Sequence, residues 1–438
     1  MQQRPSRERL EEALDRLGAR HDPSIFTRLY ETGARGEADA ADRRAAAGQS
    51  LGPLDGAIIS IKDLFDVAGE VTMAGAARPR ADTPALADAE IVRRLRAAGG
   101  VILGKTNMTE FAFSGLGLNP HYGTPGNARD PGRIPGGSSA GAGVAAGLGI
   151  GEIAIGTDTG GSVRIPAALN GVVGFKPTAV RVPRGGALPL SYTLDSIGPL
   201  AGTVSLCAAA DQVMSGAGAR GALPPAPLAG RRVAVVEPFL ADTEPAIGTA
   251  FAESLARLEA AGVSLVACDV RDLITAMWET LAEAPIVAVE AAEIHAEALA
   301  HHRAAFDPQV LARLLPGILV PAPRYVAALR RRERLIAALD ARLAAADLIL
   351  AMPTTPLEAP PIAAVAEDAA YQRTNMLMLR NTSFGNFFDL CGISLPMPKD
   401  GMPAGLMLLG RQGDDAALLS LALAVERVLA VQRPPGSD

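Results

Sequence analysis

Short apolar runs alternate with amphipathic segments along almost the whole chain. Residues 6–50 carry charged and apolar positions at helical spacing, as in LEEALDRL, and predict solvated helices over a core. The β-branched runs at 56–62 and 101–105 predict buried strands. Between them, the segment from 84 to 98 predicts a helix that two glycines end. This succession is typical of a β-α-β arrangement.

The segment from 119 to 176 is dense in glycine and serine, yet apolar runs are interleaved with its glycines. Flexible linkers lack such runs, so the pattern indicates tight turns that join buried elements. Ordinary alternation resumes after residue 205. It predicts strands at 231–237, 263–268, 348–353, 393–398 and 404–410, and helices at 246–261, around 271–301, at 323–346 and at 414–429. Without a long polar break, the pattern predicts a single α/β domain around a large sheet.

Composition excludes several classes of function. The 438 residues hold 41 basic and 47 acidic side chains, a net charge of −6, which disfavours a general electrostatic attraction to nucleic acid or anionic membranes. The three cysteines, Cys207, Cys268 and Cys391, show no CxxC spacing, so neither a disulfide framework nor a structural zinc site is expected. The first residues carry alternating charges where a secretory signal has an apolar region, and we expect a cytoplasmic protein.

Lysine is conspicuously rare. Only Lys62, Lys105, Lys176 and Lys399 stand among the 41 basic residues. Because arginine stays charged at all ordinary pH values, a lysine kept in such a sequence is a candidate for losing a proton. Lys62 ends the predicted strand at 56–62, whereas Lys399 lies in a turn-like segment typical of the surface.

Two nucleotide-binding patterns are false matches. Residues 99–106 satisfy GxxxxGK[ST], but the residues that should form the phosphate loop are the apolar strand itself. Gly141 to Gly147 loosely imitate a dinucleotide loop, but no strand leads into them.

Histidine chemistry has equally little support. His295, His301 and His302 lack HExxH spacing and are expected to face solvent on one helix, and no histidine is tied by sequence to the serine motifs. A hydrolase of this sequence therefore needs another base.

Two serine motifs supply that alternative. The sequence GGSSAG at 136–141 is followed by DTGGSVR at 158–164, with Lys62 upstream. Together with GFKPT and LDSIGPLAGTVSL, these motifs resemble the amidase signature family over about residues 50–205, and weaker resemblance extends over most of the chain. The resemblance implies one domain, residues 1–438, with a central mixed β-sheet flanked by helices. Within it we expect a helical segment (1–50), the signature core (50–205), and pocket helices with closing strands (206–438).

The resemblance also implies a Ser-Ser-Lys triad. Ser162 would be the nucleophile, Lys62 the general base and Ser138 the proton relay between them. Burial at the end of an apolar strand favours the neutral amine that Lys62 needs for this role. In the family the relay serine follows a cis peptide bond, which here would be Gly137–Ser138.

Backbone N–H groups before Ser162 would stabilise the oxyanion. The expected donors are those of Thr159, Gly160, Gly161 and Ser162. Asp158 and Arg164 are expected to brace the turn that carries the nucleophile, and Ser139 to hydrogen-bond within its loop. Lys105 and Lys176 are expected to make structural ion pairs or hydrogen bonds.

The implied activity is hydrolysis of a non-peptide C–N bond with water, without a metal, nucleotide or flavin cofactor. Scarce charge among the candidate pocket residues favours an apolar or aryl amide, with a carbamate, urethane or ester as alternatives. The aromatic candidates for the pocket or the core are Phe113, Tyr122, Tyr192, Trp278, Phe384, Phe387 and Phe388.

Two other functions stay open. One is the glutaminase (A-type) component of a tRNA-dependent amidotransferase, which would require partner subunits. The other is a binding scaffold that has lost catalysis, which the presence of all three triad residue types disfavours. The expected partners are small molecules, without nucleic acid or membrane, and a homodimer is compatible with the sequence.

Overall fold

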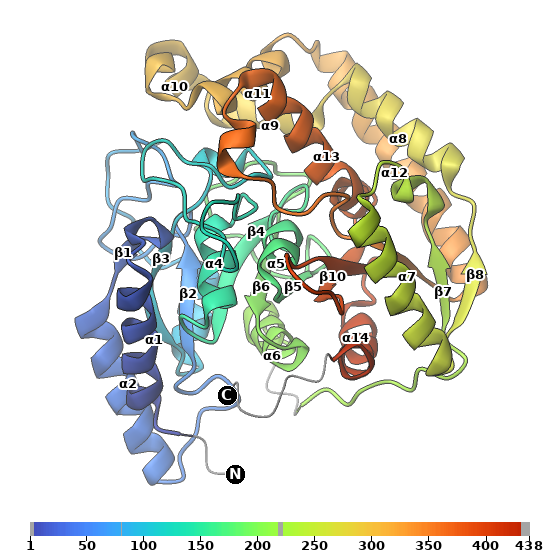
Figure 1. Cartoon of the computed structure of the whole chain (residues 1–438). Helices are drawn as coiled ribbons and strands as arrows, with labels where there is room; N and C mark the ends of the chain where they lie inside the picture. The colour runs from blue at the N-terminus through green and yellow to red at the C-terminus, as the bar shows by residue number, and fades with distance from the viewer. Residues whose placement is uncertain (1–3, 80, 218–221, 431–438) are drawn as a thin grey trace.

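One mixed β-sheet of eleven strands forms the centre of the molecule. The computed structural model describes residues 4–79, 81–217 and 222–430. The strand order is β1-β3-β2-β4-β6-β5-β10-β11-β9-β7-β8. The strands are β1 Phe26–Leu29, β2 Ile58–Lys62, β3 Val101–Thr106, β4 Ile153–Asp158, β5 Val173–Lys176, β6 Ser196–Ala201, β7 Arg232–Val235, β8 Ser264–Ala267, β9 Leu348–Pro353, β10 Cys391–Pro396 and β11 Gly405–Gly410. Figure 1 shows this sheet running across the molecule from β1 to β8.

The sheet combines parallel and antiparallel pairs. β2 pairs in parallel with β3 and β4, and β7 pairs in parallel with β8 and β9. The middle strands β6, β5, β10 and β11 are joined by antiparallel pairs. The α/β domain with a central mixed sheet is therefore confirmed. Parallel strands covered on both faces are apolar throughout, which explains why β2 and β3 are readable in the sequence as continuous runs.

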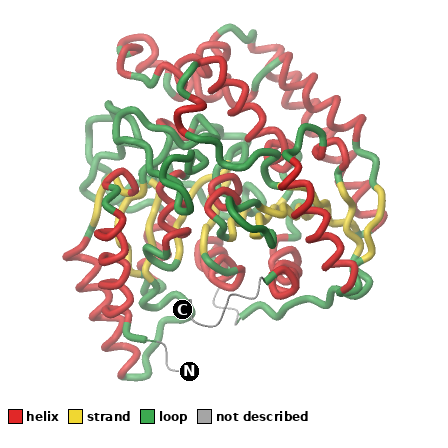
Figure 2. The backbone as a smooth tube through the Cα atoms, in the orientation of Figure 1, coloured by secondary structure: helices red, strands yellow, loops and turns green. Residues whose placement is uncertain are grey.

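Helices cover both faces of the sheet, as Figure 2 shows. Along β4, Ile153 and Ile155 belong to the large core with residues of α6 and α14, whereas the intervening Ala154 packs with residues of α4 and α5. This alternation is the period of two that a strand imposes on its side chains. The helices are α1 Ser6–Arg20, α2 Glu31–Ala46, α3 Glu90–Ala97, α4 Ala140–Leu148, α5 Arg164–Asn170, α6 Val204–Ser215, α7 Pro245–Ala260, α8 Arg271–Glu283, α9 Ile286–Ile294, α10 Ala296–His301, α11 Pro308–Ile318, α12 Ala322–Ala346, α13 Asp368–Phe387 and α14 Asp415–Leu429.

Several predicted helices have different limits in the structure. The helix expected at 84–98 begins only at Glu90, because the backbone of Ala85 pairs with the loop at Gly69 and Glu70 and cannot turn helical. The segment around 271–301 is divided into α8, α9 and α10. The first break falls at Pro285, whose ring disfavours helical geometry in the residue before it.

The twenty-residue helix α13 is absent from the sequence-based prediction. It packs against α5 and reaches the turn that carries Ser162. In the described part of the chain no single helix has both the length and the apolar composition to cross a bilayer; α11 and α12 meet both conditions only as a pair bent by 97°.

Candidate active site

Lys62 and Ser138 meet beneath the carboxyl end of β2. Lys62 is the last residue of that strand and is fully buried, as is Ser138. The Lys62 Nζ atom lies 2.7 Å from Ser138 Oγ and 2.8 Å from Thr157 Oγ1. The Gly137–Ser138 peptide bond is cis. The structure thus places a lysine amine in direct hydrogen-bond contact with the serine that the sequence motif assigns to proton relay.

Burial sets the charge state of Lys62. Removal from water lowers the pKa of its amine to about 7, and the carboxylates of Asp195 and Asp158 oppose this shift only in part. Both carboxylates belong to residues near the ends of neighbouring strands. Near neutral pH a substantial fraction of the Lys62 amine is therefore unprotonated and able to accept a proton.

Ser162 lies on the turn that leads from β4 into α5, with its exposed fraction only 4 %. The backbone N–H of Ser139 donates to the Ser162 carbonyl at 3.3 Å, which ties the two serine motifs together. Ser139 Oγ also donates to the Thr157 carbonyl, at 3.4 Å. Within the described residues the Ser162 hydroxyl has no hydrogen-bond partner, and Ser162 lines a small cavity.

Asp158 organises this turn from the end of β4. Its carboxylate accepts hydrogen bonds from the backbone N–H groups of Gly161 and Val163 and from the Arg164 guanidinium, at 2.9 Å to Nη2 and 3.0 Å to Nε. Burial alone would raise the pKa of Asp158, but the Arg164 charge and its hydrogen bonds hold the pKa well below its usual range. Asp158 and Arg164 are thus a buried, fully hydrogen-bonded ion pair that holds the turn without lining the cavity.

The expected oxyanion donors divide into two groups. The Gly161 N–H donates to Asp158 Oδ1 at 2.9 Å and so helps to hold the turn. This corrects the prediction that Gly161 is an oxyanion donor, because its N–H is already occupied. The N–H groups of Thr159, Gly160 and Ser162 make no hydrogen bond with the described residues. Thr159, Gly160 and Ser162 also line the cavity, as an oxyanion site requires.

Helix α13 supports the turn from the opposite side. Thr382 Oγ1 donates to the Gly160 carbonyl at 2.6 Å, and Asn386 Nδ2 donates to the Asp158 carboxylate at 2.8 Å. Gly161 has a φ of 135°, and a Cβ there would lie 2.1 Å from Thr382 Oγ1. Only glycine therefore fits between the turn and the helix.

Asp195 is a further residue of the site that the sequence analysis did not single out, although it lies within the LDSIGPL motif. Its buried carboxylate accepts the Thr159 hydroxyl at 2.5 Å and the backbone N–H groups of Leu190 and Ser191. Burial raises the pKa of Asp195, against these hydrogen bonds. It links the oxyanion turn to the loop that forms another wall of the cavity.

The cavity at Ser162 has a volume of about 100 Å³ and a largely apolar lining. Of the aromatic candidates, Phe113 and Phe387 line it. The residues that line the cavity are Ala112, Phe113, Ser114, Thr159, Gly160, Ser162, Leu190, Leu194, Leu281, Val287, Arg313, Leu379, Ser383, Asn386 and Phe387.

The other aromatic candidates lie elsewhere. Phe384 and Phe388 are core residues that pack on one another with their ring centres 4.6 Å apart. Tyr192 and Trp278 are 53 % and 40 % exposed and do not reach the cavity, and neither does Tyr122. The sequence could not separate these cases, because an aromatic side chain suits a core and a pocket equally well.

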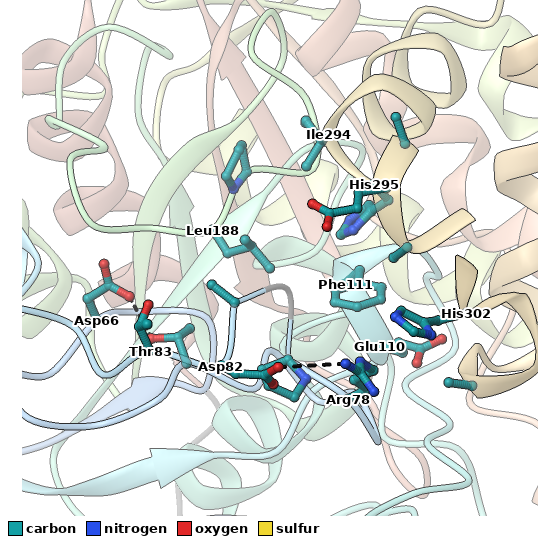
Figure 3. Close-up of a pocket in the computed structure, with 18 of the residues that line it drawn as sticks. Asp66, Arg78, Asp82, Thr83, Glu110, Phe111, Leu188, Ile294, His295 and His302 are labelled. Carbon is teal, nitrogen blue, oxygen red and sulfur yellow. Dashed lines mark hydrogen bonds and ion pairs between the residues drawn. The ribbon is translucent and has the colours of Figure 1, made fainter. Parts of the chain in front are cut away.

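A larger cavity, of about 870 Å³, is lined by other residues of the segment that carries Phe113. Figure 3 shows its lining, which includes Glu110, Phe111 and His295 but none of the three triad residues. Burial raises the pKa of Glu110 to about 8. His295 is buried, with its ring centre 4.1 Å from that of Phe111, so the expectation that it faces solvent is wrong.

The remaining lysines have structural contacts. Lys176 Nζ donates to the carbonyls of Pro177 and Leu390, each at 2.8 Å. Lys105 forms an ion pair with Glu70 at 3.6 Å. Lys399 is only 10 % exposed and pairs with Glu358, so it is not the free surface lysine that its turn-like sequence suggests.

Comparison with known proteins agrees with this arrangement. The model of the amidase family matches residues 8–419. The chain is 37 % identical to 2-amino-5-chloromuconic acid deaminase from Comamonas testosteroni, over 90 % of this chain and 86 % of the relative. It is 35 % identical to the AtzE subunit of 1-carboxybiuret hydrolase from Pseudomonas sp. (strain ADP), over 97 % and 94 % of the two chains.

Two further similarities extend over nearly the whole chain. The A-type subunit of the glutamyl-tRNA(Gln) amidotransferase from Chloroflexus aggregans is 33 % identical, over 95 % of this chain and 92 % of the relative. A crystal structure described as an amidase superposes with a TM-score of 0.86 and 36 % identity, covering 97 % of this chain and 96 % of that one.

Proposed function

Because the chain belongs to the amidase family, whose members are hydrolases acting on C–N bonds, we propose that it cleaves a small non-peptide amide through an acyl-enzyme on Ser162. The observation that carries this proposal is the buried Lys62 amine, 2.7 Å from the Ser138 hydroxyl and with its pKa lowered by burial to about 7. A neutral amine in that position can accept the proton that a serine nucleophile must lose.

Acylation begins when Ser162 Oγ rotates to within hydrogen-bond distance of Ser138 Oγ. The Ser162 proton passes to Ser138 while the Ser138 proton passes to Lys62 Nζ, and Ser162 Oγ forms a bond to the carbonyl carbon. The carbonyl oxygen becomes an oxyanion that the N–H groups of Thr159, Gly160 and Ser162 stabilise. One such donor contributes about 3 kcal/mol to transition-state stabilisation in other hydrolases.

Collapse of this intermediate breaks the C–N bond. The Lys62 ammonium returns its proton through Ser138 to the departing nitrogen, which leaves as ammonia or an amine. Water then repeats the sequence in place of Ser162: it gives a proton to the relay, attacks the acyl carbon, and releases the acid as Ser162 recovers its proton. No step requires a metal or a cofactor.

The size of the cavity bears on the substrate. Sites for drug-sized ligands enclose about 300–1,000 Å³, whereas the cavity at Ser162 encloses about 100 Å³. Its apolar lining and small volume support a compact amide, with a carbamate or ester as the alternatives. The names of two relatives, 2-amino-5-chloromuconic acid deaminase and 1-carboxybiuret hydrolase, denote small nitrogen compounds that carry a carboxyl group.

The similarity to the A-type component of an amidotransferase keeps a glutaminase as the second candidate function. Free glutamine carries an α-ammonium group as well as a carboxylate. The described lining of the cavity contains no Asp or Glu to accept an ammonium group, so we favour the stand-alone amidase.

Covalent labelling tests the nucleophile. A small fluorophosphonate should modify the wild-type protein at Ser162, as located by mass spectrometry of peptides, and Ser162→Ala should abolish the adduct. Ser205→Ala, at an exposed serine outside the site, is the matched control and should label like the wild type. An adduct that persists on another serine in Ser162→Ala would refute the assignment.

A further inference from the structure

A buried carboxylate outside the cavity of Ser162 holds the loop that forms one of the cavity walls. Glu290 lies on α9 and does not itself line the cavity. Its carboxylate accepts hydrogen bonds from the hydroxyl groups of Ser191 and Thr193, and from the Thr193 backbone N–H at 3.1 Å. The Tyr325 hydroxyl of α12 donates a further hydrogen bond, at 2.6 Å. Glu290 therefore ties the loop of residues 190–195, the wall loop, to two helices.

Asp195 ties the other end of the wall loop to the oxyanion turn. Its carboxylate accepts the backbone N–H groups of Leu190 at 2.9 Å and Ser191 at 3.1 Å, and the Thr159 hydroxyl at 2.5 Å. Ser191 is thus shared by the two carboxylates, because its hydroxyl donates to Glu290 and its N–H donates to Asp195. The contacts form one continuous chain of hydrogen bonds from α12 to the oxyanion turn.

The wall loop also supplies part of the apolar lining of the cavity. Leu190 and Leu194 line the cavity, and so does Val287, which lies one helical turn before Glu290 on α9. A buried polar network with all its groups satisfied favours one arrangement, since any displacement leaves a polar group without its partner. The network therefore fixes the wall loop relative to Thr159, whose backbone N–H is one of the expected oxyanion donors.

From this chain of contacts we infer that Glu290 is a positioning residue, which acts through the wall loop to hold Thr159 where its backbone N–H meets the oxyanion. The inference rests on the proposed function, because an oxyanion forms in this cavity only when Ser162 attacks a substrate. It deepens that function by giving a role in the reaction to a residue outside the cavity. A carboxylate with a purely structural role would affect the stability of the fold, but not the reactivity of Ser162 in the molecules that are folded.

Fluorophosphonate labelling of Ser162 measures this reactivity without turnover. Ser162 Oγ forms a bond to phosphorus, fluoride leaves, the Ser162 proton passes to the relay, and negative charge grows on the phosphoryl oxygen during the attack. The amplitude of labelling counts the folded, competent sites, and the rate constant reports their reactivity. Its dependence on the concentration of the probe separates the maximal rate constant from the half-saturating concentration.

Glu290→Gln keeps the size of the side chain but replaces one acceptor oxygen by an amide donor. The maximal rate constant of labelling should fall about 10- to 100-fold, as expected for displacement of one oxyanion donor. The half-saturating concentration should stay within about threefold of the wild type, because the lost interaction is made in the transition state. Glu293→Gln, at an exposed position one turn further along α9, is the matched control and should be labelled like the wild type. An unchanged maximal rate constant in Glu290→Gln would overturn the inference.

A double-mutant cycle tests the route through Thr159. Thr159→Val nearly preserves the shape of the side chain and removes the hydroxyl that Asp195 holds. In this background Glu290→Gln should lower the maximal rate constant by less than about threefold, because the chain of hydrogen bonds is already broken at its inner end. If the two effects multiply instead, Glu290 does not act through Thr159, and the inference is refuted while the proposed nucleophile stands. If Ser162 is not labelled in the wild type, the proposed function fails, and this inference fails with it.

Discussion

Replacement of Lys62 by methionine should stabilise the fold in a pH-dependent way. The chain length is nearly conserved while the charge is removed. In the unfolded chain the Lys62 amine has its ordinary pKa of 10.5, and burial lowers it to about 7 in the folded protein. Between these values the unfolded state binds more protons than the folded state, so the contribution of Lys62 to stability must rise with pH.

The size of the effect follows from the two pKa values. The difference between 10.5 and about 7 corresponds to a folding cost of about 5 kcal/mol, fully present below pH 7 and absent above pH 10.5. At pH 7 itself the cost is about 4 kcal/mol, and at pH 9 it is about 2 kcal/mol. Methionine avoids this cost but loses the hydrogen bonds to Ser138 and Thr157, each worth about 1 kcal/mol.

Lys62→Met should therefore be more stable than the wild type by about 2 kcal/mol at pH 7, and this advantage should disappear near pH 9. Urea unfolding of both proteins at pH 7, 8 and 9, at constant ionic strength, measures the difference, in which all shared titrations cancel. Lys399→Met, which removes a lysine paired with Glu358, supplies the pH dependence of losing a lysine outside the site. A Lys62→Met difference that does not change with pH would show that the Lys62 amine keeps an ordinary pKa and is no base at neutral pH.

Two further predictions concern the same machinery. Because the general base must be neutral, kcat/KM should fall about tenfold per pH unit below the Lys62 pKa of about 7, and Lys62→Arg should abolish turnover at every pH, since arginine cannot lose its proton; near-normal rates in Lys62→Arg would remove Lys62 from the mechanism. Gly161→Ala should cost about 3 kcal/mol in urea unfolding and most of the activity, because its Cβ would meet Thr382 Oγ1, whereas Gly185→Ala, which meets no atom within 4 Å, should behave as wild type.

The buried strands could be predicted because their environment removes ambiguity. β2, β3 and β9 lie inside the sheet with both faces covered, so their sequences are short apolar runs between turns. The motifs around Ser138 and Ser162 could be identified through their resemblance to the amidase signature family. Composition narrowed the candidates for a proton-accepting amine to four lysines, and the resemblance to the amidase signature family assigned that role to Lys62.

Helix α13 could not be predicted because polar residues share its buried face with apolar ones. Asn375, Asn381, Thr382 and Asn386 are all buried, and they hold backbone groups of the site and its surroundings. A helix is normally recognised in a sequence by apolar residues every three or four positions. In α13 some of those positions are polar residues that hold the nucleophile turn. The apolar periodicity of the helix is therefore too weak to predict it.

Arg313, which lines the cavity at Ser162, could not be singled out from the sequence. Almost every cation of this chain is an arginine, so the composition that makes one lysine conspicuous gives no means to choose one arginine among so many. What distinguishes Arg313 is its place in the cavity over the Phe113 ring, and such contacts are set by the fold, not by neighbours in the sequence. The rare lysines are thus visible in the composition, whereas the arginine of the cavity is recognised only from its surroundings in the fold.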